Sequence, residues 1–109
     1  MNVIETINHE HGPRIIVLQN SQVFSEILTR CIKDWFRNPD VVSFENGDDA
    51  WAELMRLEPD LLMTDRIHAG MNGEELVWRL AAKEVRYPVL LLSADMPAND
   101  ELPRSIKLV

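Results

Sequence analysis

The sequence has little cysteine, glycine or tyrosine, and it lacks any cluster of basic residues. Its 109 residues include one cysteine, four glycines and one tyrosine. A single cysteine excludes an internal disulfide, and its place within a helical pattern favours a small buried apolar side chain at Cys31 over a reactive thiol. Eleven basic residues against eighteen acidic ones give a net charge of −7. The chain therefore lacks the positive surface that nucleic acid or an anionic membrane would require.

Long apolar runs are also missing. No stretch approaches the roughly eighteen consecutive apolar residues of a membrane-spanning helix, and residues 1–14 have no apolar centre of the kind found in a signal peptide. We therefore expect a cytoplasmic protein. Apolar residues still make up 46% of the chain, which is enough for one domain with its own core.

Short apolar runs alternate with segments of helical periodicity. Continuous runs typical of strands buried on both faces occupy residues 15–18, 41–44, 61–64 and 89–93. Helical patterns with capping residues at their starts follow Ser21, Asn46 and Asn72, and the last of these extends to about Lys83. Residues 1–13 are polar and turn-rich, and we expect a flexible leader there, followed by one domain over residues 14–109. The alternation predicts an α/β fold in three layers, with a doubly wound parallel sheet between helices.

Polar side chains follow three of the expected strands. Gln19 and Asn20 come after the first strand, Asp65 ends the third, and Ser93 closes the fourth. The carboxyl ends of parallel strands lie at one edge of the sheet, where doubly wound proteins bind ligands. We expect these residues to gather there.

The same segments resemble the response-regulator receiver domain, the CheY-like phosphoacceptor module of two-component signalling. The resemblance rests on IIVLQNSQ, ENGDDAWAEL, PDLLMTDRIHAGMNGEEL and YPVLLLSAD, and it covers residues 14–95. Its most specific part is a family pattern in which the acceptor aspartate is followed by three variable residues and then by Pro-Gly-Met-Asp-Gly. In this chain the aspartate is Asp65, the variable residues are 66–68, and the last five residues read AGMNG. The resemblance implies a flavodoxin-like sheet with strand order 2-1-3-4-5.

The resemblance also implies a phosphoaspartate switch. Asp65 would accept a phosphoryl group from a sensor histidine kinase or a phosphotransfer protein, Ser93 would contact that group, and Mg²⁺ would neutralise its charge. The metal ligands implied are Asp65, the backbone carbonyl of Ile67 and the pair after the first strand.

That pair departs from the family. Receiver domains carry acidic residues there, whereas this chain has Gln19 and Asn20, which can form only a weak Mg²⁺ site. At about 4 Å and an effective dielectric near 20, each missing charge forfeits on the order of 4 kcal/mol of attraction per unit of cation charge. We expect weak phosphorylation or none, and action through protein contacts. The pair equally fits a simpler role in capping the first helix.

The carboxyl-terminal segment departs as well. The family's fourth and fifth helices have no counterpart, so the last helix is missing, and residues 105–109 fit a fifth strand. Lys107 is then the one candidate for the family's phosphate-contacting lysine, unless that lysine lies beyond Val109 in a longer parent. An uncovered sheet face would favour a homodimer or attached domains.

Other interpretations remain open. Asp65 and Ser93 also fit ordinary strand-end roles, and Trp51, Met55 and Trp78 fit a core or an interface. A small nucleotide- or flavin-binding α/β module is the alternative function, although no GxGxxG or Walker A loop follows a strand. The sequence has no nucleophile–histidine pairing of the kind found in hydrolases, so we do not expect an enzyme.

Overall fold

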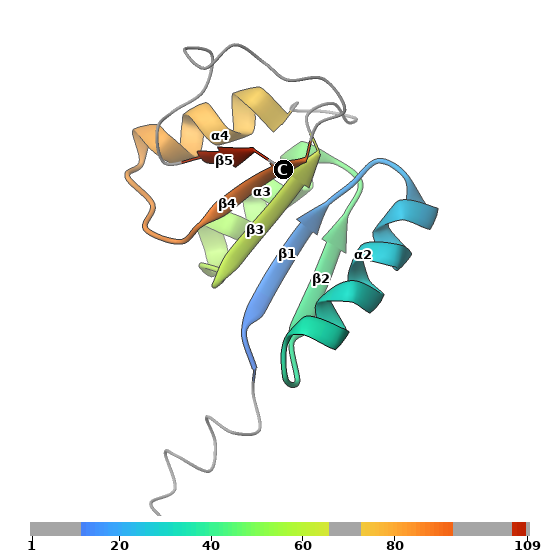
Figure 1. The fold of residues 1–109 in the computed structure, drawn as a ribbon. Helices are drawn as coiled ribbons and strands as arrows, with labels where there is room; N and C mark the ends of the chain where they lie inside the picture. The colour runs from blue at the N-terminus through green and yellow to red at the C-terminus, as the bar shows by residue number, and fades with distance from the viewer. Residues whose placement is uncertain (1–11, 66–72, 93–105, 109) are drawn as a thin grey trace, which may run out of the picture.

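The computed structural model describes residues 12–65, 73–92 and 106–108, and these form a parallel sheet between two layers of helices (Figure 1). The elements in chain order are β1 (Arg14–Leu18), α2 (Gln22–Trp35), β2 (Asp40–Phe44), α3 (Gly47–Arg56), β3 (Leu61–Asp65), α4 (Gly73–Ala82), β4 (Val89–Leu92) and β5 (Ile106–Leu108). The strand order is β2-β1-β3-β4-β5, with every pair parallel. Fold class, strand order and the fifth strand agree with the prediction.

Two of the helices begin at the capping residues expected. The Ser21 hydroxyl accepts a hydrogen bond from the Phe24 amide at 3.2 Å, and the Asn46 carboxamide accepts one from the Asp48 amide at 2.8 Å. Each cap satisfies an amide that has no partner within its own helix. Asn72, the third expected cap, lies outside the described residues.

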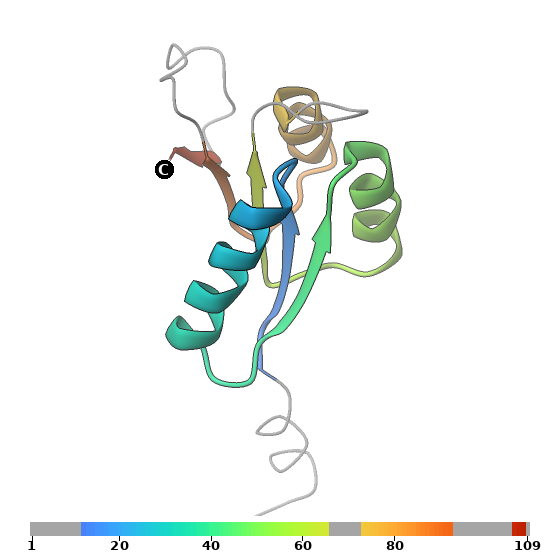
Figure 2. The ribbon, with the colours of Figure 1, turned by 90° about the vertical axis from the view of Figure 1, so that its right-hand side faces the viewer.

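The sheet separates two apolar cores. Figure 2 shows α2 on one face of the sheet and α3 and α4 on the other. Successive strand residues point to opposite faces, so Ile16 and Leu18 pack toward α3 and α4, whereas Ile15 and Val17 pack toward α2. The larger core also contains buried residues of β3, α3, α4 and β4: Ala50, Leu54, Leu62, Leu76, Val77, Leu80 and Val89. The smaller core is completed by Leu28, Ile32 and Met63.

Helix α2 buries less of its apolar pattern than the sequence suggests. Leu28 and Ile32 enter the core, but Phe24 is 43% exposed and Trp35 is 64% exposed. Cys31, expected to be buried, is only half-buried. The reason is geometric, because these side chains lie on a flank of α2 that the helix does not press against the sheet.

The aromatic and methionine residues of α3 and α4 divide between core and surface. Trp51 packs against the larger core, and the guanidinium of Arg79 lies 5.6 Å from the centre of its ring. Met55 and Trp78 are exposed. Within the described residues, no helix is long and apolar enough to cross a membrane.

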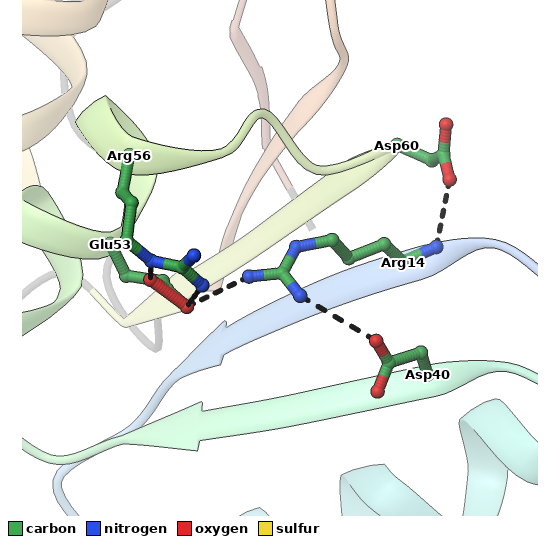
Figure 3. A network of polar contacts seen from close by, with 5 residues as sticks. All are labelled: Arg14, Asp40, Glu53, Arg56 and Asp60. Atoms are coloured by element: carbon green, nitrogen blue, oxygen red, sulfur yellow. Dashed lines mark hydrogen bonds and ion pairs between the residues drawn. The ribbon is translucent and has the colours of Figure 1, made fainter.

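The amino ends of the strands are held by the Arg14 clamp, formed by Arg14, Asp40, Glu53, Arg56 and Asp60 (Figure 3). The Arg14 guanidinium contacts Glu53 at 2.9 Å and Asp40 at 3.5 Å, and its amide donates to Asp60 at 2.7 Å. Hydrogen bonds from Arg56, and then from Arg14, lower the pKa of Glu53 to about 2. The clamp therefore ties β1, β2, α3 and the start of β3 together.

Gly12 and Pro13 belong to the folded domain although the sequence places them in the leader. The Gly12 amide donates to the Asn38 carbonyl, and the Pro13 carbonyl accepts from the Asp40 amide, both at 2.8 Å. Residues 1–11 lie outside the described part, so the leader itself stays a prediction.

Candidate functional site

Asp65 is the last residue of β3, at the carboxyl edge of the sheet, as its position after an apolar run predicts. It is half-buried and lies opposite Leu92 of β4. The preceding Thr64 is fully buried, and its hydroxyl donates to the Asp65 carbonyl at 2.9 Å. The aspartate is thus carried by a central strand that pairs with β1 on one side and with β4 on the other.

Gln19 and Asn20 follow β1 at the same edge. Because Leu18 pairs with Thr64 in the β1–β3 register, Gln19 lies one step further on, level with Asp65. The Gln19 amide donates to the Phe44 carbonyl at 2.9 Å, which holds this turn against β2. Gln19 is 4% exposed, whereas Asn20 is exposed. The structure therefore brings the expected pair to the edge that carries Asp65.

The carboxamide of Gln19 has a local partner. Its Oε1 atom accepts a hydrogen bond from the Ser21 amide at 3.2 Å, immediately before α2. A side-chain oxygen that accepts from a backbone amide two residues later closes a tight turn. Gln19 thus supports the start of α2, one of the two roles left open by the sequence.

The remaining candidate residues are only partly visible. Ser93 and Ile67 lie outside the described residues. The backbone of Lys107 is in β5 and pairs with Leu90 of β4, while its side chain is not described. The roles of these three residues stay predictions.

The donor set at this edge is mostly neutral. Of the metal ligands expected, Asp65 supplies a carboxylate, and Gln19 and Asn20 can supply only amide oxygens. Among residues 12–65, 73–92 and 106–108, no group of three or more histidine, cysteine, aspartate or glutamate side chains could hold a metal ion. Proteins usually bind Mg²⁺ through one or two carboxylates together with neutral oxygens, and Asp65 is the one carboxylate among these three side chains.

Two features of the surface could not be read from the sequence. One is the exposed apolar flank at the start of α2, where Val23, Phe24 and Ile27 are 69%, 43% and 50% exposed. The other is a pocket of about 610 Å³ between α2 and β2. Periodicity indicates that a helix has an apolar side, but not how much of that side its neighbours cover.

A doubly wound parallel sheet of this strand order, with an aspartate at the carboxyl end of β3, is the architecture of CheY-like modules and is shared with flavodoxin-like proteins. The family model of the response regulator receiver domain matches residues 15–104, and the chain belongs to this family. This finding favours the signalling prediction over the nucleotide- or flavin-binding alternative.

The relatives agree at the level of the fold. The receiver domain of the Francisella response regulator 1452 superposes with a TM-score of 0.74 at 15% identity, over 88% of this chain and 83% of that one. The receiver domain of the sensor histidine kinase PA1611 from Pseudomonas aeruginosa PAO1, solved with magnesium in its active site cleft, gives 0.71 at 19% identity over 82% and 73%.

A curated relative is similar in sequence over part of its length. It is protein-glutamate methylesterase/protein-glutamine glutaminase 1 of Syntrophus aciditrophicus (strain SB), 28% identical over 81 residues. The match covers 74% of this chain and 23% of that protein. The chain therefore spans about a quarter of that relative's length.

Proposed function

We propose that this receiver domain works in two-component signalling with a degenerate metal pocket, so that it is phosphorylated weakly at Asp65 or acts without phosphorylation. The observation that carries the proposal is the hydrogen bond between the Gln19 carboxamide and the Ser21 amide. Where the family has a metal-binding carboxylate, this side chain is neutral and closes the turn before α2.

The physical consequence is a loss of charge at the reaction centre. A phosphoryl group reaching Asp65 would bring further negative charge to a half-buried carboxylate. Neither Gln19 nor Asn20 offers the anionic oxygens that retain Mg²⁺, so little cation charge would be held there to offset the repulsion. Phosphorylation at Asp65 would be correspondingly slow.

The experiment is a titration with Mg²⁺ and beryllofluoride, followed by backbone NMR around Asp65, with intact mass measured after incubation with a small-molecule phosphodonor. We expect small shifts and little added mass in the native chain. The double variant Gln19→Asp/Asn20→Asp should bind both and gain mass, whereas adding Asp65→Asn to it should abolish the beryllofluoride response and the gain in mass. Saturation of the native protein at ordinary millimolar Mg²⁺ would overturn the degenerate pocket.

We propose that signalling proceeds through protein contacts at the exposed start of α2. Val23, Phe24 and Ile27 lie within two turns of the Gln19–Asn20 turn, so a sensor kinase or phosphotransfer protein docked there would also reach the edge that carries Asp65. Phe24→Ala and Ile27→Ala should weaken that binding and leave the unfolding transition nearly unchanged. Trp35→Ala, at the far end of the same helix, is the matched control. The domain itself would turn over no substrate.

A further inference from the structure

The outer edge of β2 and the polar flank of α2 form a surface that takes no part in the proposed phosphorylation of Asp65. The strand order places β2 at the end of the sheet (Figure 1). The Asp40 amide donates to Pro13, and the Phe44 carbonyl accepts from Gln19. Residues of a strand alternate in direction, so Asp40, Val42 and Phe44 direct their backbone groups toward β1. The amides and carbonyls of Val41 and Ser43 therefore point outward.

A groove runs along this edge. It is the pocket of about 610 Å³, and all of its lining side chains are polar or charged: Gln22, Ser25, Glu26, Thr29, Arg30, Lys33, Ser43 and Glu45. At its base the Ser25 and Ser43 hydroxyls lie 3.2 Å apart in a hydrogen bond. The free backbone edge and a polar groove thus occur side by side.

The edge is poorly protected against pairing. Exposed edge strands usually carry lysine, proline or a bulge that discourages another strand. Strand β2 has the sequence DVVSF, in which Asp40 is the one charged residue and is engaged by Arg14. Neither Val41 nor Ser43 would obstruct an added strand.

The arrangement of charges along the groove favours a second copy of this chain as its binding partner. Along α2, Glu26 lies toward the carboxyl ends of the strands, and Arg30 and Lys33 lie toward the amino ends. A two-fold axis normal to the sheet would reverse this order in a second copy. Each Glu26 would then approach the partner's Arg30 and the partner's Lys33, so the groove is complementary to itself.

We propose that two copies of this chain associate through antiparallel pairing of their β2 strands. With the axis near Val42, Val41 pairs with the partner's Ser43 and the reverse pairing also forms, which gives four backbone hydrogen bonds. The Ser25–Ser43 bond puts residue 25 level with residue 43. From the rises of strand and helix, Val42 is then level with residues 27–28, about midway between Glu26 and Arg30.

Sedimentation and light scattering of the full chain over a wide concentration range test the pairing. We expect a dimer in the native chain. Glu26→Lys places like charges together twice in each dimer and should weaken association about tenfold. The compensated variant Glu26→Lys/Arg30→Glu/Lys33→Glu should recover it. Lys83→Glu, an exposed change at the end of α4, is the matched control and should have no effect.

A second pair of measurements tests the backbone hydrogen bonds between the two β2 strands. Ser43→Pro removes an outward amide while leaving the bonds to β1, so it should abolish association in a protein that still unfolds cooperatively. Amide exchange at Val41 and Ser43 should slow as concentration rises, whereas exchange at Val42 should be slow throughout. A monomer at every concentration overturns the proposal, and so does a dimer that is indifferent to Glu26→Lys and Ser43→Pro. None of these outcomes depends on metal or phosphate at Asp65.

Discussion

At the scale of single residues, Gly12 has no room for a side chain. A Cβ atom built on it would overlap the backbone carbonyls of Arg37 and Asn38, and neither carbonyl is the end of a flexible side chain. We expect Gly12→Ala to lower the free energy of unfolding by about 1–3 kcal/mol. Urea denaturation measures the change.

Asn38 provides the control on the other side of that contact. Its φ of 50° lies in the left-handed region, which glycine adopts readily. Asn38→Gly should therefore change the free energy of unfolding by only about 0.3 kcal/mol. Equal losses from the two substitutions would show that the turn, and not the space at Gly12, sets the effect.

Glu84 is a second residue whose backbone conformation conflicts with its type. Its φ is 55°, at the end of α4, where its amide donates to Ala81 and the Val85 amide to Leu80. This bonding is a Schellman motif, whose left-handed position is usually glycine. Glu84→Gly should raise the melting temperature through a gain of about 1 kcal/mol. Glu84→Ala keeps the Cβ and should give no such gain, and a gain of the same size would reject the backbone explanation.

At the scale of elements, the Arg14 clamp makes the free energy of unfolding depend on pH. The folded pKa of Glu53 is about 2 against an ordinary 4.5, so the folded state binds this proton less readily than the unfolded state. The stability that Glu53 contributes is complete above pH 4.5 and is lost as pH falls toward 2. Glu53→Gln should be less stable at neutral pH, and its stability should fall less over that interval. Chemical denaturation at several pH values measures both slopes, and parallel slopes would contradict the assignment.

The elements also show what the sequence could predict. Strand and helix positions followed from short apolar runs, from the caps Ser21 and Asn46, and from the spacing of apolar residues. The exposed flank of α2 did not follow, because burial depends on which neighbours reach a helix. Asp65 was placed correctly because a strand end is encoded locally. The sequence could not predict the partner of the Gln19 carboxamide, because a carboxamide can either close a turn or line a polar pocket.

At the scale of the whole molecule, the fold and the edge chemistry can be separated. The two cores maintain the sheet along its centre, and the Arg14 clamp holds the amino ends of the strands, opposite to the end that carries Asp65. Gln19 and Asn20 therefore can change without loss of the domain, provided that the turn before α2 keeps an acceptor for the Ser21 amide. An aspartate at position 19 retains such an acceptor, although its shorter side chain alters the reach.

That separation predicts how Mg²⁺ changes stability. Binding to the folded state alone adds RT ln(1 + [Mg²⁺]/Kd), which is about 2.7 kcal/mol at a hundred times Kd. We expect almost no Mg²⁺-dependent rise in the melting temperature of the native chain. In Gln19→Asp/Asn20→Asp, repulsion among the carboxylates should lower stability without metal, and Mg²⁺ should restore it. The same variant with Asp65→Asn should lose part of the rise, because one of the three anionic ligands is gone. A native chain stabilised by Mg²⁺ as strongly as the double variant would mean that neutral side chains at positions 19 and 20 suffice to hold the ion.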